Sequence, residues 1–228
     1  MLAAATLAAG GGQAVAAPAA KRATADWTRT VVTTPAGTYV MGNPKAKVKL
    51  VEYLSLSCSH CAAFSAEGMP VLKRDYITRG LVSLEIRNAV RDGFDFAGVM
   101  LSRCTGSLSY FPTSERILAT QSTWIPKAEA YAQAQAGKAE TGSDADAIAG
   151  MAQAVGFTDL VRARGMTPAR VKACLADPKH SATVTAMAVE AFEQRKIPGT
   201  PSFLINGVLA PDTSSWATLQ PKLAAALR

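Results

Sequence analysis

Three segments in the first half of the chain have the pattern of apolar and polar residues that is typical of β-strands. The predicted strands are 38–41, 47–57 and 81–90. Between the second and third of these, apolar residues recur at helical spacing and predict a helix over 61–79, broken near Gly68 and Pro70. The chain therefore opens with the order strand, strand, helix, strand.

The second half of the chain is predicted to be helical at first and then to form a hairpin. Helical periodicity extends from Phe94 to about Phe192. Breaks are predicted near Pro112, Pro126, Gly142, Gly156 and Thr167–Pro168. Strands at 202–205 and 208–210 flank Asn206-Gly207, a strong hairpin signal, and 216–227 closes the chain as an amphipathic helix.

This order of elements is that of a thioredoxin fold, an α/β architecture, carrying an inserted all-helical domain. We predict that residues 38–92 and 193–228 form the thioredoxin-like domain and that 93–192 form the helical insertion. The insertion would then overhang the end of the sheet where the first helix begins. From that position it could shape a groove for a substrate.

The composition of the chain indicates the size of its core and argues against a nucleic-acid partner. The 228 residues are 49% hydrophobic, enough for one core with an inserted satellite. Twenty-four basic and seventeen acidic residues give a net charge of +7, but the basic residues are scattered singly or in pairs. Without a basic patch interleaved with aromatic residues, the charge indicates a solvated surface and no nucleic-acid partner.

The N-terminus resembles a secretory signal. Residues 1–16 combine a short Ala/Leu stretch, three glycines and the cleavage-like triplet Ala14-Val15-Ala16, and 17–37 would be an N-terminal extension. No Lys or Arg precedes Lys21, so the basic start of such a signal is missing. Gly10 to Gly12 interrupt the apolar stretch before it could span a membrane. We expect export to a compartment where disulfides persist.

The most informative motif is Cys58-Ser59-His60-Cys61, which lies where the strand at 47–57 meets the following helix. A cysteine at a helix N-terminus is stabilised as a thiolate by unpaired backbone N–H groups and the helix dipole. We expect Cys58 to be the exposed nucleophile with a low pKa and Cys61 to be the buried resolving thiol. The motif predicts thiol–disulfide exchange.

Other interpretations of the same motif are weaker. A zinc site needs about four ligands, and four cysteines and two histidines offer no second Cys-x-x-Cys or His-x-x-x-His. A purely structural disulfide across so short a loop would constrain little of the unfolded chain. Coincidence is disfavoured because the flanking strand and helix are the context that the motif requires.

Two further residues are candidates for the exchange chemistry. His60 lies between the cysteines, where an imidazole could donate a hydrogen bond or a positive charge to the thiolate; the alternative is a solvated histidine without effect. Glu52 falls on the same strand face as Leu50 and Leu54, so alternation turns a carboxylate toward the core. A buried carboxyl has a raised pKa and could carry the proton that Cys61 gains or loses; the alternative is a surface glutamate.

Cys104 and Cys174, 70 residues apart, remain outside the motif. In an exported protein, a leftover pair most often forms a structural disulfide, and two buried free thiols are the alternative. Closing this loop would contribute about 4 kcal/mol by the chain-entropy model. The second histidine, His180, is expected at the surface and receives no role.

The sequence resembles the DsbA-type thioredoxin-like oxidoreductases of the bacterial envelope over about residues 38–226. The resemblance is carried by 42–48, by 51–61, which includes the Cys-x-x-Cys motif, and by Gly199-Thr200-Pro201-Ser202-Phe203. It places Glu52 at the family's acidic position, six residues before the first cysteine. It also implies a cis peptide bond at Thr200–Pro201, facing the cysteines and contacting an extended substrate.

The resemblance implies a periplasmic enzyme that passes its Cys58–Cys61 disulfide to reduced or unfolded exported proteins. A membrane quinone-linked partner would reoxidise it, and no cofactor or bound metal is expected.

Thr200 and Ser59 depart from the Val and Pro of the best-known oxidases, which leaves the direction of electron flow open. A disulfide isomerase is one rival, although 17–37 is short for a dimerisation segment, so we expect a monomer. A non-catalytic module holding a soft metal through Cys58, His60 and Cys61 is another.

Overall fold

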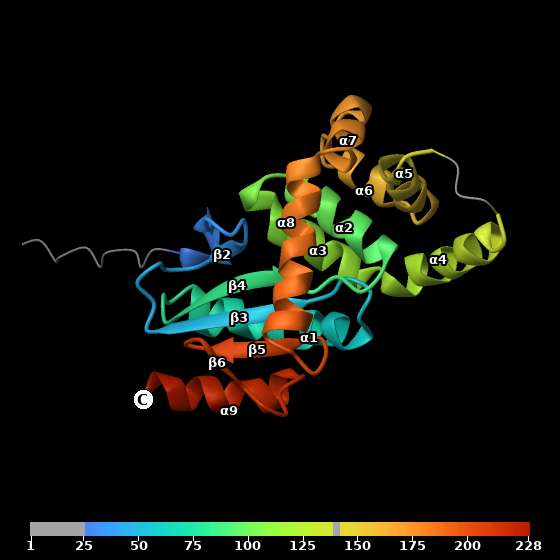
Figure 1. The fold of residues 1–228 in the computed structure, drawn as a ribbon. Coiled ribbons are helices and arrows are strands. Elements are labelled where there is room, and N and C mark those ends of the chain that lie inside the picture. The colour runs from blue at the N-terminus through green and yellow to red at the C-terminus, as the bar shows by residue number, and fades with distance from the viewer. Residues whose placement is uncertain (1–25, 139–141) are drawn as a thin grey trace, which may run out of the picture.

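The computed structural model describes residues 26–138 and 142–228, whose strands form one sheet (Figure 1). The predicted signal peptide, residues 1–16, lies outside the described residues. The strands are β1 (Val31–Thr33), β2 (Tyr39–Met41), β3 (Val48–Leu54), β4 (Val82–Asn88), β5 (Ser202–Ile205) and β6 (Val208–Leu209).

Helices surround this sheet on both faces. They are α1 (Ser59–Val71), α2 (Gly93–Cys104), α3 (Ser107–Ala119), α4 (Gln121–Gln135), α5 (Asp144–Ala154), α6 (Phe157–Arg162), α7 (Pro168–Leu175), α8 (Pro178–Val189) and α9 (Trp216–Leu227). A 3-10 turn at Trp27–Arg29 precedes β1, and π-helical segments continue α1 (Leu72–Ile77) and α8 (Glu190–Gln194).

The sheet has the order β1-β2-β4-β3-β5-β6. Strands β3 and β4 are parallel and are joined through α1, whereas β2, β5 and β6 pair antiparallel with their neighbours. This is the thioredoxin arrangement, interrupted between β4 and β5 by α2 to α8. The predicted fold class, a thioredoxin fold with a helical insertion, is confirmed.

Several predicted boundaries differ from those of the structure. Strand β3 ends at Leu54, three residues early, because 55–57 turn into α1 with the Cys58 N–H bonded to the Ser55 carbonyl. Strand β1 was not predicted; it lies within the segment 17–37 and pairs with β2. Its three residues are partly or fully exposed, so they carry no alternating apolar pattern.

Prolines end fewer helices than the sequence suggests. Helices α3 and α4 continue through Pro112 and Pro126, and α1 continues through Pro70 before becoming π-helical at Leu72. All three prolines are exposed, so water can bond the carbonyl that each leaves without an N–H partner. The break between α2 and α3 was not predicted. It falls at Gly106, whose φ of 92° turns the chain between the two helices.

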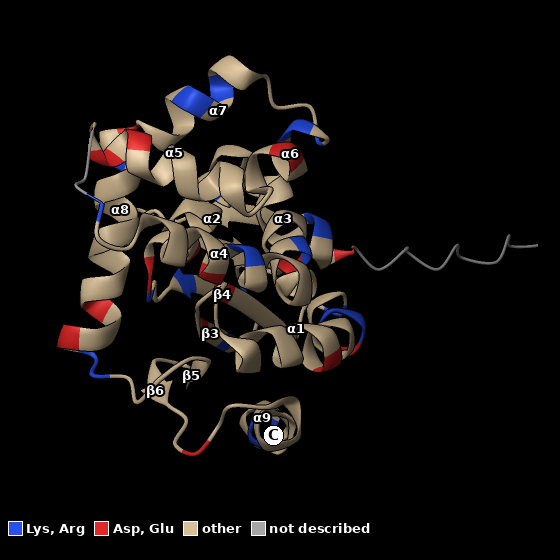
Figure 2. Cartoon of the chain, turned by 90° about the vertical axis from the view of Figure 1, so that its right-hand side faces the viewer, with Lys and Arg blue, Asp and Glu red and all other residues tan. Residues whose placement is uncertain are grey.

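The sheet lies between α8 on one face and α1 on the other, as Figures 1 and 2 show from two directions. Helix α9 packs against α1 and β3. The approach is close at Gly68, where an added Cβ would lie 2.8 Å from the Phe64 ring and 3.1 Å from Trp216. A larger residue there would have to displace the Phe64 ring and the start of α9.

The helical insertion shares its core with the thioredoxin-like sheet. Leu56, in the loop before Cys58, is fully buried. An added Cβ at Gly98 of α2 would lie 3.0 Å from Leu56 and 3.1 Å from Phe157 of α6. The loop that carries the first cysteine is therefore packed directly against the helical insertion.

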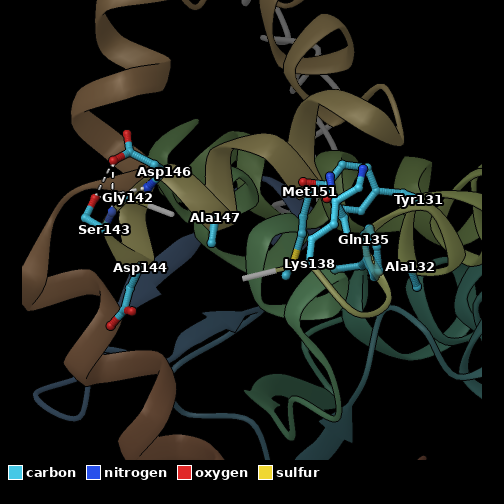
Figure 3. Close-up of a pocket in the computed structure, with 11 residues that line it drawn as sticks. Tyr131, Ala132, Gln135, Lys138, Gly142, Ser143, Asp144, Asp146, Ala147 and Met151 are labelled. Atoms are coloured by element: carbon cyan, nitrogen blue, oxygen red, sulfur yellow. Dashed lines mark hydrogen bonds between the residues drawn. The ribbon is translucent and has the colours of Figure 1, made fainter. Parts of the chain in front are cut away.

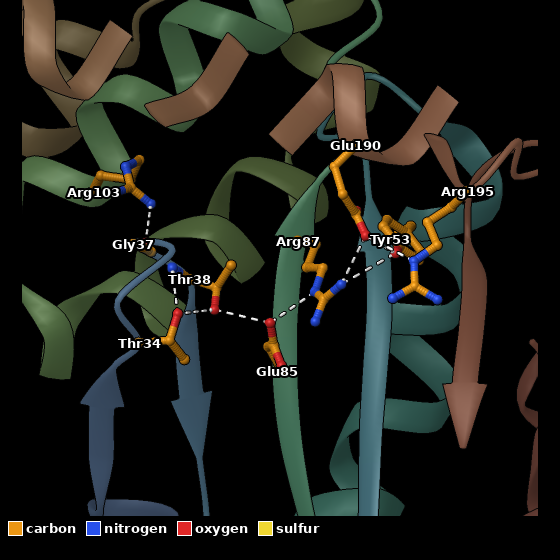
Figure 4. Close-up of polar contacts among 9 residues, drawn as sticks. All are labelled: Thr34, Gly37, Thr38, Tyr53, Glu85, Arg87, Arg103, Glu190 and Arg195. Atoms are coloured by element: carbon orange, nitrogen blue, oxygen red, sulfur yellow. Dashed lines mark hydrogen bonds and ion pairs between the residues drawn. The ribbon is translucent and has the colours of Figure 1, made fainter. Parts of the chain in front are cut away.

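A polar network connects Glu190, the residue that follows α8, to strands β3 and β4 (Figure 4). The Arg87 guanidinium of β4 donates to Glu85 at 2.8 Å and to Glu190 at 2.9 Å. The Tyr53 hydroxyl of β3 donates to the same Glu190 carboxylate at 3.0 Å. The return of the chain from the insertion to β5 is thus held by partly buried ion pairs.

Basic and acidic residues lie interspersed over the helices (Figure 2). In the part of the chain that the structure describes, none of the helices is both long and apolar enough to cross a lipid bilayer.

Candidate active site

Cys58 is the N-cap residue of α1, with extended backbone angles of −83° and 121°, and Cys61 lies in the first turn. Both are free thiols. The expectation of an exposed nucleophile is wrong, because Cys58 is only 3% exposed and Cys61 is fully buried. The Cys58 sulfur lies against the backbone carbonyl of Thr200, at 3.0 Å, and this distant segment could not be placed from local sequence.

Hydrogen bonds lower the pKa of Cys58 to about 4. The largest contribution is the bond from the Cys61 thiol, which outweighs burial; the Thr200 side chain and the backbone N–H groups of Cys61 and His60 add to it. No other group among the described residues bonds the buried Thr200 Oγ1, which leaves its hydroxyl to donate to the Cys58 thiolate. Cys58 is therefore a thiolate at neutral pH.

Cys61 has the opposite character. Burial raises its pKa far above the usual range, and its hydrogen bond to Cys58 and the charge that Glu52 carries when it is ionised raise the pKa further. Cys61 thus keeps its proton while Cys58 gives its proton up. Such a pair separates a nucleophile from a proton-holding resolving thiol.

Glu52 lies on the central strand β3, between Ile86 of β4 and Phe203 of β5, and is 1% exposed. Burial raises its pKa to about 8, with smaller contributions from the charges of Glu115 and Cys58. Its Oε2 has no hydrogen-bond partner among the described residues. Glu52 is buried, as predicted, but so are its neighbours Val51 and Tyr53 on the opposite face, so its burial does not depend on alternation. The carboxyl holds a proton at neutral pH.

The side chain of His60 is exposed on the first turn of α1. The group of His60 that helps to lower the pKa of Cys58 is its backbone N–H. A contribution from the imidazole stays a prediction.

Thr200 and Pro201 are joined by a cis peptide bond. They line a groove of about 250 Å³ between the segment 198–202 and the segment 209–214 that follows β6. Beside this groove, Val208 of β6 is 72% exposed and Leu209 is 37% exposed. An extended chain could therefore lie next to Cys58 on a partly apolar surface.

Two residues of the insertion hold the active-site loop and were not predicted. Asp95 of α2 is fully buried and accepts bonds from Ser55 Oγ at 2.7 Å and from the Leu56 N–H at 2.8 Å. Gln121 of α4 donates to the carbonyls of Leu56 at 2.6 Å and Cys58 at 3.0 Å. In the sequence, Asp95 looks like any acidic residue in the first turn of a helix, where such residues are common. No motif or pattern in the sequence identifies Gln121 as a contact of the active-site loop.

Asp95→Ala is expected to destabilise the protein by about 3 kcal/mol, because it leaves buried donors of the active-site loop without an acceptor. Asp92, the N-cap of the same helix, supplies a graded control, since Asp92→Ala removes one cap bond and should cost about 1 kcal/mol. Urea unfolding of both variants measures the difference. Equal losses would mean that Asp95 acts only as part of the helix terminus.

A separate pocket of about 380 Å³ lies between α4 and α5 (Figure 3). Tyr131 and Gln135 of α4 and Ala147 and Met151 of α5 line it, and Met151 lies beside Tyr131. It contains none of the residues predicted for the exchange chemistry.

A disulfide joins Cys104, the last residue of α2, to Cys174 of α7, with the Cα atoms 6.0 Å apart. It ties two helices of the insertion to each other. Cys174 is buried and Cys104 is partly exposed.

Comparison with known proteins agrees with this geometry. The sequence model of the family described as Thioredoxin matches residues 34–224. A curated relative from Rickettsia bellii, named "Putative protein-disulfide oxidoreductase", is 28% identical over 169 residues, which is 74% of this chain and 57% of the relative. A relative from Rickettsia prowazekii is 29% identical over 54% of its length. The chain spans little more than half the length of these curated relatives.

Two solved structures are similar along almost their full length. Protein-disulfide isomerase from Novosphingobium aromaticivorans is 32% identical with a TM-score of 0.75, covering 83% of this chain and 96% of that one. Wolbachia pipientis alpha-DsbA1 shares the fold at 18% identity with a TM-score of 0.67, covering 86% and 94%. With the Cys-x-x-Cys at the α1 N-terminus and the family match over most of its length, the chain belongs to the thioredoxin family.

Proposed function

We propose that the protein is a thiol:disulfide oxidoreductase that transfers the Cys58–Cys61 disulfide to exported substrate proteins. The observation that carries this proposal is the separation of the two thiols, with the pKa of Cys58 lowered to about 4 and that of Cys61 raised. Stabilising the Cys58 thiolate stabilises the reduced enzyme, which makes its disulfide a stronger oxidant.

The reaction proceeds through a mixed disulfide on Cys58. A substrate thiolate attacks the Cys58 sulfur; the electron pair of the broken bond goes to Cys61, which takes up a proton from the neutral Glu52 carboxyl. A second substrate thiolate then attacks the substrate sulfur of the mixed disulfide and releases Cys58 as a thiolate. The substrate loses two electrons and the Cys58–Cys61 pair gains them.

Thr200 and Pro201 would bind the substrate backbone beside Cys58, in the groove next to β6. We propose reduced or unfolded exported proteins as substrates and a membrane quinone-linked protein as the oxidant of the reduced enzyme. Residues 1–16 would direct export to the periplasm. The redox domain would comprise 38–92 and 193–228, with 93–192 as the insertion, in a monomer.

Disulfide isomerisation is the second candidate, favoured by the name of the relative at 32% identity. It uses the same two cysteines but usually needs a dimer.

The reduction potential of the Cys58–Cys61 pair, measured against glutathione buffers, tests the proposal. A value near about −120 mV supports a disulfide donor or isomerase, and sedimentation then separates monomer from dimer. A value near about −270 mV would reverse the direction and make the protein a reductase.

Thr200→Val is expected to raise the pKa of Cys58 by about one unit, because the variant loses a hydroxyl that can donate to the thiolate. The reduced form then loses stabilisation, and the disulfide becomes a weaker oxidant. Ultraviolet thiolate absorbance against pH measures the shift. Thr200→Ser keeps the hydroxyl and serves as the control; the same shift in both variants would contradict this role.

A further inference from the structure

A second chemical cluster lies in the insertion, away from the residues that exchange disulfides. In the described part of the chain, Cys104, Cys174 and His180 are the one group of three potential metal ligands, with ligand atoms all within 4.8 Å of one another. The end of α2, the end of α7 and the start of α8 bring them together. His180 Nδ1 lies 3.3 Å from the Cys104 sulfur.

We propose that this disulfide is a redox-gated zinc site. When a dithiol reductant opens the Cys104–Cys174 bond, the reductant becomes a disulfide and the protein gains two thiols. The two thiols then bind one Zn²⁺ ion as thiolates and release two protons, and neutral His180 supplies Nδ1 as the third ligand. Exchange with an external disulfide, which is itself reduced to a dithiol, would re-form the Cys104–Cys174 bond and release the ion. This inference does not depend on the proposed function of Cys58 and Cys61.

The backbone geometry suits such a site. Zinc binds thiolate sulfur at about 2.3 Å and imidazole nitrogen at about 2.0 Å, which places tetrahedral ligands roughly 3.5–3.8 Å apart. The Cα atoms of the two cysteines are 6.0 Å apart, so small side-chain rotations can separate the sulfurs to that distance. His180 Nδ1 lies 3.3 Å from the Cys104 sulfur and no more than 4.8 Å from that of Cys174, so the imidazole needs only a small movement.

After reduction of the disulfide, each of the two cysteine thiols would have a polar group beside it. The Cys174 sulfur lies 3.3 Å from the Met100 carbonyl oxygen, which can accept a bond from a free thiol. The Cys104 sulfur faces His180, whose side chain is 36% exposed, so an ion can enter from solvent and a water can take the fourth position.

The charges around the cluster are mixed. Asp177 caps α8 through Oδ1, while its Oδ2 lies 3.8 Å from His180 Nδ1 and places negative charge beside the site. Arg170 is the basic residue at the rim, where Nη2 donates to the Cys104 carbonyl at 3.5 Å and not to its sulfur. Two thiolates and one imidazole form a soft donor set, which favours zinc over magnesium or calcium.

The test uses the full chain with Cys58→Ser and Cys61→Ser, which removes the other two thiols from metal binding. The protein is reduced with dithiothreitol, desalted without oxygen and titrated with Zn²⁺ by calorimetry and with Co²⁺ by absorption. We expect one ion per reduced chain, release of two protons, a thiolate-to-cobalt charge-transfer band, and no binding to the oxidised chain. A folded reduced chain that binds no zinc would overturn the proposal.

Two variants in the same background identify the ligand. His180→Ala should weaken zinc binding by at least about tenfold, whereas Lys179→Ala, its exposed neighbour on α8, should leave it unchanged. Equal affinity of the His180 variant and its parent would remove His180 from the site. If the reduced chain unfolds, circular dichroism is followed instead: zinc should restore the fold in the parent and not in His180→Ala, and failure in the parent would reject the site.

Discussion

Replacing Cys58 with serine is expected to reduce disulfide transfer to the uncatalysed rate, because the sulfur at the α1 N-terminus is the atom that a substrate thiolate attacks. Cys61→Ala should behave differently. It keeps the Cys58 thiolate, which can attack a substrate disulfide, but it cannot resolve the product, so mixed disulfides should accumulate. Oxidation of a reduced substrate protein and mass spectrometry of the trapped complexes measure the two outcomes.

The same pair of variants tests the origin of the low pKa. The thiolate absorbance that titrates at about pH 4 should disappear in Cys58→Ser, and its midpoint should rise in Cys61→Ala because the strongest hydrogen bond to Cys58 is lost. Ser59→Ala changes an exposed residue between the cysteines and should alter neither measurement. If mixed disulfides accumulated in Cys58→Ser instead, the two roles would be reversed.

The low pKa also predicts how stability depends on pH. The pKa of Cys58 falls from 9.0 to about 4 on folding, so the reduced protein gains stability as pH rises from 4 to 9, and gains it fully above 9. At pH 7 this contribution is about 4 kcal/mol. Reduced Cys58→Ser should lack it at pH 7 and match the parent below pH 4, as urea unfolding can measure.

Glu52→Gln is expected to change both the exchange reaction and the stability. Glutamine cannot give a proton to Cys61, so exchange should slow and its pH profile should lose the inflection near pH 8. Calorimetric or fluorescence assays of single-turnover exchange across this range provide the measurement. An unchanged profile would exclude Glu52 as the proton carrier.

The stability effect of this substitution has the opposite sign to that of Cys58. Folding raises the pKa of Glu52 from 4.5 to about 8, so the carboxyl costs nothing below pH 4.5 and its penalty grows until about pH 8. At pH 7 the penalty is about 3 kcal/mol, and Glu52→Gln should recover up to that amount. At pH 4 the variant should gain nothing. Glu115→Gln, a partly exposed control, removes a smaller influence on Glu52 and should move the inflection slightly lower.

The local features of the site could be predicted because each rests on short-range physics. The Cys-x-x-Cys needs only a strand followed by a helix. Glu52 is buried because every residue from Leu50 to Leu54 is buried in this central strand, so a carboxylate on either face would be buried. The burial of Cys58 could not be foreseen, because the Thr200 carbonyl that lies against it is 142 residues away. The same holds for Asp95 and Gln121, which reach the loop only through the packing of α2 and α4.

The boundaries that were missed have a similar explanation. Local propensity penalises Pro112 and Pro126, but whether a helix ends there depends on whether the freed carbonyl can reach water, which is decided by the finished fold. Glycine at 106 marks the true end of α2 through its positive φ.

The contacts of Asp95 and Gln121 with the active-site loop have a consequence for exchanging parts between relatives. The helical insertion is part of the scaffold that shapes the first turn of α1, and it is not an independent module resting on the sheet. A chimera that kept the Cys-x-x-Cys but took its insertion from another family member would inherit the donor's anchoring residues, or their absence. Where those residues differ, a graft would alter redox behaviour even though every cysteine were retained.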